Sequence, residues 1–229
     1  MISKYTLKNY NEIFNVYGSF YSVIVPNLGK IRCRNVLKIS RKKKNNKKIS
    51  SIFIMMNPGS GKGINSSEED LRLYTLDEFI NNGGPEISFI ETIPDNVQME
   101  TMKIMDLMNW DNVYVINLND VRNPNSKKFR EEVKNIRNLI REEDKKSITS
   151  IFNIYRNDRE VILRESKNIV CCFGVSNPKY MTNELVSYLK SKNIVPKGIK
   201  KDNDESKYYY LKPLGGKSIV DDLIKILKK

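Results

Sequence analysis

Histidine does not occur anywhere in the chain of 229 residues, and its absence excludes several classes of site. Without an imidazole there is no Ser-His-Asp triad, no histidine general base and no histidine ligand for zinc. Any catalysis must therefore use carboxylates, amides, hydroxyls, lysine, arginine or a metal held by oxygen atoms. We expect no resident cofactor and no metal.

Cysteines are few and long apolar runs are missing. Cys171 and Cys172 are neighbours inside an apolar segment, and with Cys33 they are the only cysteines, a pattern typical of buried thiols rather than of a disulfide framework. No apolar run approaches the roughly 20 residues that span a bilayer. The first residues do not follow the pattern of a signal peptide. We expect a cytoplasmic protein without membrane contact.

Acidic residues are outnumbered by basic ones, 27 against 40, which gives a formal net charge of +13. Such an excess favours a polyanionic partner, a nucleic acid or a nucleotide. A run of basic residues without any acid extends from Lys38 to Lys48. It is either a solvated loop or a flexible loop that contacts phosphates. In the second interpretation the residues on the nucleic-acid backbone are Arg41, Lys42, Lys43 and Lys44.

The hydrophobic pattern divides the chain near residue 50. Residues 1–50 are predicted to be a small β-rich lead-in, with strands at 21–25 and 31–34 around a turn, followed by the basic loop. Residues 51–229 alternate apolar strands, at 51–56, 113–118 and 168–173, with amphipathic segments that include a helix starting at Ser66 or Ser67. We predict an α/β domain, a three-layer α/β/α sandwich with a mostly parallel central sheet.

Polar loops follow the predicted strands, and in open α/β sheets ligands bind at this edge. The loop at 57–63 is not a Walker P-loop, because Met56 stands where the first glycine is required and Gly63 where Ser or Thr would bind magnesium. Glycines before a helix still expose N–H groups that suit an anion. We expect the loops to form one cleft, with Asn57 as the candidate catalytic residue and these substrate-binding residues: Pro58, Gly59, Ser60, Lys62, Asn117, Ser176, Asn177 and Lys212.

Three short motifs carry a resemblance to known families: Met-Met-Asn-Pro-Gly at 55–59, Val-Tyr-Val-Ile-Asn-Leu at 113–118, and Arg-Asn-Pro at 122–124. Their order over roughly residues 50–216 resembles a bacterial and phage family of domains of unknown function, family 1643. It is similar, more distantly, to the uracil-DNA glycosylase superfamily. The resemblance implies that Asn57 positions a water or faces the sugar and that Asn117 hydrogen-bonds a base edge. Lys212 stands where these families have histidine, and it would stabilise a base anion by charge.

The resulting hypothesis is a uracil-DNA-glycosylase-like domain that binds nucleic acid or a nucleotide at Asn57-Pro58-Gly59, with or without catalysis. One alternative is an active N-glycosylase, a hydrolase, although no carboxylate lies in the first loop to support its transition state. Another is a module that binds a small molecule or a protein. Simpler interpretations also stay open, since Asn57-Pro58-Gly59 can be a tight turn and Lys212 a solvent-facing strand end. Nothing in the sequence indicates the oligomeric state.

Overall fold

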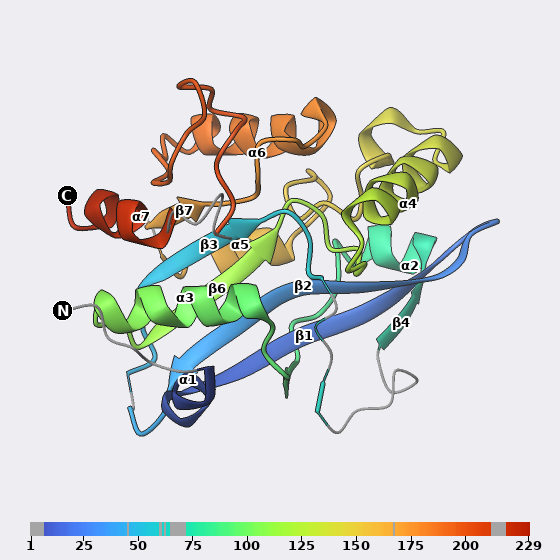
Figure 1. Cartoon of the computed structure of the whole chain (residues 1–229). Coiled ribbons are helices and arrows are strands. Elements are labelled where there is room, and N and C mark those ends of the chain that lie inside the picture. Colours follow the sequence, from blue (N-terminus) through green and yellow to red (C-terminus); the bar gives the residue numbers. More distant parts are fainter. Residues whose placement is uncertain are drawn as a thin grey trace.

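The computed structural model describes residues 7–44, 46–59, 61, 63–64, 72–166, 168–211 and 219–229. In these parts the chain is an α/β protein with one sheet of seven strands, and none of the described helices is long and apolar enough to cross a membrane (Figure 1). The strands are β1 (Phe14–Val25), β2 (Gly29–Arg41), β3 (Ser51–Met55), β4 (Arg72–Thr75), β5 (Phe89–Glu91), β6 (Asn112–Asn117) and β7 (Ile169–Cys171). The helices are α1 (Leu7–Ile13), α2 (Leu76–Asn81), α3 (Asn96–Leu107), α4 (Ser126–Leu139), the 3-10 helix η1 (Glu143–Lys145), α5 (Asp158–Leu163), α6 (Lys179–Ser191) and α7 (Ile219–Leu227).

The sheet is mixed, so the prediction of a mostly parallel sheet was wrong. Its order is β4-β1-β2-β6-β3-β7, with β5 also paired to β1. β3 runs parallel to β6 and β7, and β4 parallel to β1, whereas β1/β2, β2/β6 and β1/β5 are antiparallel. The reason is the N-terminal hairpin, which was predicted as a lead-in. Its two strands are joined by a tight turn and must be antiparallel, and β2 continues the sheet by pairing with β6.

Residues predicted to begin a helix at Ser66 or Ser67 have a different structure where they are described. Residues 65–71 lie outside the described part, and Arg72–Thr75 form the edge strand β4 beside β1. The helix α2 begins only after Thr75, whose side chain accepts a hydrogen bond from the Glu78 N–H while the Glu78 side chain accepts one from Thr75. This reciprocal capping box defines the start of the helix.

Hydrophobic side chains cover both faces of the sheet. Along β3 they alternate, with Ile52 and Ile54 in the cluster that contains side chains of α2, α4, α5 and α6. Phe53 and Met55 belong to the other cluster, formed with side chains of α1, α3 and α7. All five β3 residues are therefore buried, as expected for a strand covered on both sides. The position of β3 fixes the loop that follows it.

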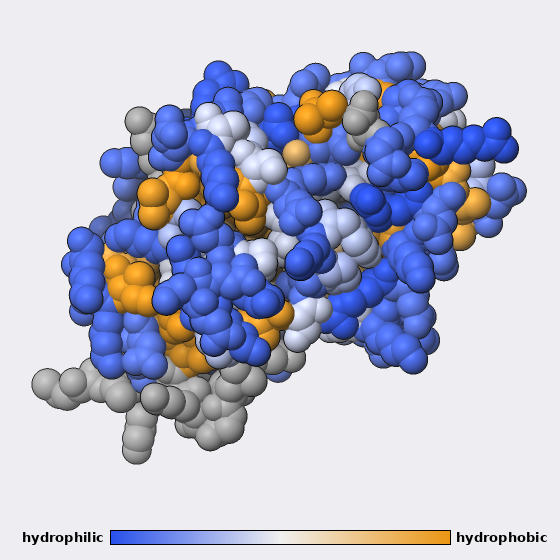
Figure 2. Space-filling model, turned by 90° about the horizontal axis from the view of Figure 1, so that it is seen from above, coloured by the Kyte–Doolittle hydropathy of each residue, from blue (hydrophilic) through white to orange (hydrophobic). Residues whose placement is uncertain are grey.

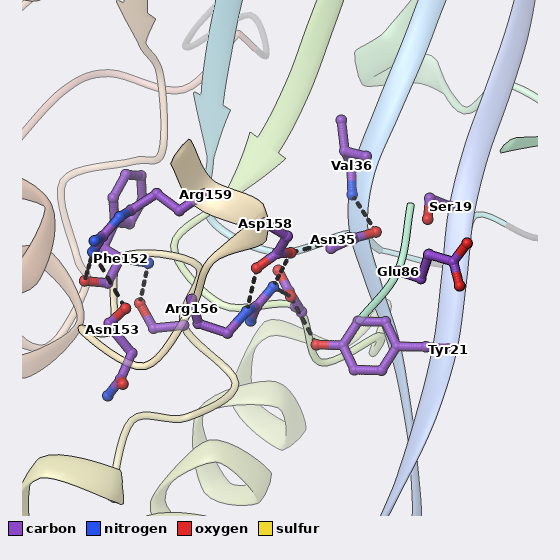
Figure 3. Close-up of polar contacts among 12 residues, drawn as sticks. Ser19, Tyr21, Asn35, Val36, Glu86, Phe152, Asn153, Arg156, Asp158 and Arg159 are labelled. Atoms are coloured by element: carbon purple, nitrogen blue, oxygen red, sulfur yellow. Dashed lines mark hydrogen bonds and ion pairs between the residues drawn. The ribbon is translucent and has the colours of Figure 1, made fainter. Parts of the chain in front are cut away.

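A buried polar network joins the hairpin to the segments after β6 and around α5. Arg156 donates through Nη2 to Asp120 and to Asp158, both at 2.7 Å, and none of the three side chains is more than 4% exposed. The Tyr21 hydroxyl donates to Asp120 at 2.8 Å, and Asn35 donates to Asp158 at 3.1 Å. Tyr21, Asn35, Arg156 and Asp158 point toward one another in Figure 3. These hydrogen bonds to the two carboxylates hold the middle of β2 against the rest of the domain.

Candidate functional site

A cavity of about 440 Å³ lies at the edge where β3 and β7 end. Both strands are parallel, so the loops that follow them leave the sheet on the same side. The cavity is lined by the loop after β3, the first turn of α3, the segment before α4 and its first turns, the loop after β7, and single residues of β2, of β6 and of the segment before α7. Those residues are Met55–Gly59, Asp95–Gln98, Pro124, Ser126, Arg130, Phe173–Asn177, Arg34, Val115 and Tyr210.

Five of the residues predicted for the site lie together on this cavity: Asn57, Pro58, Gly59, Ser176 and Asn177. Three further predicted residues, Ser60, Lys62 and Lys212, lie outside the described residues. The expected convergence of the loops after β3 and β7 is therefore present in the part of the chain that the structure describes.

The amide of Asn57 has a structural contact as well as a place on the cavity. Its Nδ2 donates to the carbonyl oxygen of Asn123 at 2.6 Å, which ties the loop after β3 to the loop after β6. Gly59 follows with φ of 68°, a left-handed conformation that glycine adopts without strain. Asn57-Pro58-Gly59 is thus a tight turn that also forms part of the cavity wall.

Asn117 does not lie on the cavity wall. It ends β6, pairs with Met55 of β3 and is completely buried. Neither its Nδ2 nor its Oδ1 has a hydrogen-bond partner among the described residues. A ligand in the cavity would therefore not meet this amide in the present arrangement, and the predicted reading of a base edge by Asn117 has no contact to support it.

Arg34 of β2 lines the cavity, and sequence reasoning missed it. The residue is 2% exposed, and its Nε and Nη1 are buried with no hydrogen-bond partner in the described part of the chain. Burial lowers the pKa of this guanidinium to about 10, although the nearby Asp95 opposes the change. The main chain is fixed, since the Arg34 N–H donates to the Asp120 carbonyl at 2.9 Å. Two buried guanidinium nitrogens without an acceptor are costly, and this arrangement is expected where an anion binds.

Gly61 explains how the loop after β3 can pass over this guanidinium. The residue is buried, and a Cβ placed on it would lie 2.8 Å from Nη1 of Arg34. Any larger residue at this position would displace the guanidinium or the loop. Glycine here allows a close approach of the loop to Arg34 and is not needed for an unusual backbone angle.

Asp95 brings a carboxylate to the cavity. Its Oδ1 caps α3 by accepting hydrogen bonds from the N–H groups of Val97 and Gln98 at 2.9 and 3.0 Å. Its Oδ2 points toward the turn after β3, 3.5 Å from a Cβ placed on Gly59. The sequence indicated Asp95 as a helix cap, but only the fold shows that this cap faces the loop of Asn57. The carboxylate missing from the first loop is supplied by another element.

Aromatic side chains form part of the cavity wall. Phe173, which follows β7, is buried and packs edge-on against Tyr208, with ring centroids 5.4 Å apart. Tyr210 is half-buried, and burial raises the pKa of its phenol well above the usual value. Among the described lining residues, the cavity therefore combines aromatic side chains with one carboxylate and two arginines.

The basic loop lies at the opposite end of the strands from the cavity. Ser40 of β2 pairs with Asn112 at the start of β6, whereas Asn57 follows the β3 residue that pairs with the end of β6. At about 3.3 Å per residue, β6 separates the two by roughly 17 Å. Lys43 and Lys44 are exposed there. These cations do not line the cavity.

Arg41, which ends β2 and was predicted to lie in the loop, and Lys42 have contacts within the protein. Nη1 of Arg41 lies 3.0 Å from the Asp106 carboxylate, and its guanidinium lies over the ring of Phe14. Nζ of Lys42 donates to the carbonyl of Asn11 at 2.7 Å. Arg41 is therefore held by packing and an ion pair, which leaves Lys43 and Lys44 as the exposed cations of the four.

The chain matches no protein-family model, no curated protein and no solved structure. Among the residues that the structure describes, no group of three or more cysteine, aspartate or glutamate side chains is placed to hold a metal ion. Fold and site together define a mixed-sheet α/β protein with a polar, partly aromatic cavity at the edge where the parallel strands end.

Proposed function

We propose that this protein binds a nucleotide or nucleic acid in the cavity beside Asn57-Pro58-Gly59. The observation that carries the proposal is Arg34, whose buried Nε and Nη1 lack an acceptor at the cavity. Burying an unpaired charge is unfavourable, so a ligand that supplies the missing anion gains most of its affinity there. Phosphate oxygens are the acceptors that a guanidinium binds best.

The remaining walls suit the other parts of a nucleotide. Tyr210 is half-buried and offers aromatic surface to a base, and about 440 Å³ is within the range of small-molecule sites. The net charge of +13 attracts polyanions from a distance. Seen from above, the surface is largely hydrophilic with apolar residues in separate patches (Figure 2). That surface suits a polar ligand better than a broad apolar docking face.

We also propose that the chain is related to the uracil-DNA glycosylase superfamily and to family 1643. In this proposal the sheet is the middle of three layers, with helices on both of its faces. The relationship is supported by the chain order of the Asn-Pro-Gly turn after β3, Asn117 at the end of β6 and the loop after β7. The antiparallel hairpin β1/β2 would be an addition to the parallel strands β6, β3 and β7.

Isothermal titration calorimetry at about 50 mM salt tests the proposal, because phosphate contacts are strong at that ionic strength. The ligands are the four common nucleoside 5′-monophosphates and short single strands of DNA and RNA. We expect at least one of them to bind, and Arg34→Met to weaken that binding at least tenfold. Arg141→Met, which removes an exposed arginine elsewhere, is the matched control and should leave binding unchanged. Absence of binding by every ligand would refute the proposal.

A hydrolytic N-glycosylase is the second candidate, and the position of Asp95 favours it. A carboxylate beside Asn57 and Gly59 can accept a proton from water or stabilise a cationic sugar, which the amide of Asn57 cannot do alone. Oligonucleotides carrying uracil, hypoxanthine or alkylated bases should then yield abasic sites. Asp95→Asn, which keeps a good helix cap but removes the charge, should abolish the product. Wild-type protein that forms no abasic site on any of these substrates would exclude this activity.

A further inference from the structure

We infer that the cavity accepts a terminal phosphate group, a phosphomonoester, and places it against Arg34. The ligand is then a free nucleotide or the phosphorylated end of a strand, not an internal stretch of nucleic acid. This inference rests on the proposed function of the same cavity and specifies which part of the ligand reaches its floor.

The first argument is depth. Arg34 belongs to the buried lining residues, together with Met55 at 4%, Gln98 at 2% and Phe173 at 1% exposure. The exposed lining residues form the rim: Asn96, Pro124, Ser126 and Ser176. A phosphate that touches Arg34 must therefore pass the rim and end at the floor. An internal phosphodiester has chain on both sides and would need two ways out of a cavity of about 440 Å³, whereas a terminal phosphate needs one.

The second argument is the supply of hydrogen-bond donors. Arg34 and Arg130 both line the cavity, and the Nε of each is buried without a hydrogen-bond partner in the described part of the chain. Asp95 is the one carboxylate among the lining residues that the structure describes, and its Oδ1 also caps α3. A phosphomonoester carries a charge between about −1.5 and −2 with three free acceptor oxygens, while a phosphodiester carries a single charge and two free oxygens. Asp95 offsets one of the two guanidinium charges, so the match lies in the hydrogen bonds. Two guanidiniums offer enough N–H donors for all three free oxygens of a monoester, whereas a diester has only two.

The third argument is the close contact between Gly61 and Arg34. Because a Cβ on Gly61 would lie 2.8 Å from Nη1, the loop after β3 fixes where the guanidinium can lie. A Gly61→Ala variant should displace the guanidinium without changing any charge. Arg34→Met removes the charge without changing the loop. The two variants therefore change the position and the charge of the same group separately.

Calorimetric titration with three matched ligands tests the inference: a nucleoside, its 5′-monophosphate and the methyl ester of that monophosphate, a diester. We expect the monophosphate to bind at least about tenfold more tightly than the other two. Arg34→Met and Gly61→Ala should each reduce its affinity toward that of the nucleoside, and Arg141→Met should not. Thermal melting of each variant confirms that it is folded, and if one variant does not fold the other still decides.

Phosphorus NMR gives a readout that a purely structural role of Arg34 would not change. Contact with a guanidinium should lower the second pKa of the bound phosphate below its usual value near 6. The lowering should be lost in Arg34→Met. Single strands with and without a 5′-phosphate distinguish a strand end from a free nucleotide as the source of the group.

Equal affinities for the monoester and the diester would overturn the inference and leave the proposed function standing. Failure of all nucleosides, nucleotides and strands to bind would overturn both. Tight monophosphate binding that neither Arg34→Met nor Gly61→Ala weakens would place the phosphate elsewhere and would also contradict the inference.

Discussion

Replacing Arg34 with methionine should make the ligand-free protein more stable. The side chain is buried at the cavity, and its Nε and Nη1 lack acceptors in the described part of the chain. Methionine keeps most of the apolar stem that packs there and removes the charge. If the guanidinium is retained for binding, its removal should improve folding while it weakens ligand affinity, a common relation between stability and function.

The magnitude follows from the effect of burial on the charge. Burial lowers the pKa of Arg34 from 12.5 to about 10, and each tenfold change in proton affinity is worth about 1.4 kcal/mol. The charged form is thus disfavoured by at most roughly 3 kcal/mol in the folded state. Because the folded pKa is the lower one, this cost is fully present at pH 7 and is relieved only as the pH rises past about 10. Allowing for imperfect packing of methionine, we expect a gain of about 1 to 3 kcal/mol.

Urea denaturation at pH 7 without ligand measures this difference. Arg141→Met, at an exposed position, should change the free energy of unfolding by less than about 0.5 kcal/mol. A nucleotide at a hundred times its dissociation constant should add about 2.7 kcal/mol to the wild type and much less to Arg34→Met. Destabilisation of Arg34→Met by more than about 1 kcal/mol would refute the reasoning, because it would show that the guanidinium stabilises the fold.

Further predictions concern the buried network, one glycine and the helix cap. Arg156→Met should lower the free energy of unfolding by about 3 to 5 kcal/mol, since it leaves the carboxylates of Asp120 and Asp158 buried without their cation; a loss below about 1 kcal/mol would show that the ion pairs contribute little. Burial raises the pKa of the Asp120 carboxyl from 3.8 to about 6, and Arg156 opposes this change. Because the folded pKa is the higher one, protonation of Asp120 stabilises the fold fully below about pH 4, and this contribution is lost as the pH rises through 6. The stability of the wild type relative to Asp120→Asn should therefore fall across that window in denaturation experiments, and a constant difference would contradict the assignment. Gly198→Ala should lower the free energy of unfolding by at least about 3 kcal/mol, because φ is 147° and the new Cβ would collide with the Cys171 carbonyl oxygen. Gly29→Ala is the control: φ is 75° but the space is open, so the loss should be about 1 kcal/mol in the same denaturation assay. Equal losses would rule out the steric explanation. Asp95→Ala should cost about 0.5 to 2 kcal/mol and Asp95→Asn clearly less, as measured by thermal denaturation, since asparagine also caps a helix; equal losses would mean that the charge and not the cap matters.

The strands of the sheet could be predicted largely from the sequence, but their directions could not. The apolar segment at 51–56 predicts a strand covered on both faces, and β3 is such a strand. The same pattern does not reveal that an antiparallel hairpin pairs with β6, because pairing between distant strands depends on the whole fold. The expected helix near Ser66 fails at Arg72–Thr75 for a similar reason, since pairing with β1 decides that segment.

The candidate site was predictable where it consists of loops that follow strands. Asn57 and Ser176 meet at one cavity because parallel strands end at one edge of the sheet. Arg34 could not be found in this way, because it lies inside a strand of the hairpin and reaches the cavity only through the pairing of β2 with β6. Asp95 shows the same limitation. Its role as a helix cap is recognisable in the sequence, but its position beside the Gly59 turn is not.

The measurement that tests the central claim most directly is diffraction from crystals soaked with 5-bromouridine 5′-monophosphate. Binding at this site predicts an anomalous bromine peak inside the cavity beside Phe173 or Tyr210, with the phosphate within hydrogen-bond distance of Arg34. A fully occupied nucleotide at the basic loop of Lys43 and Lys44, with none in the cavity, would contradict the claim.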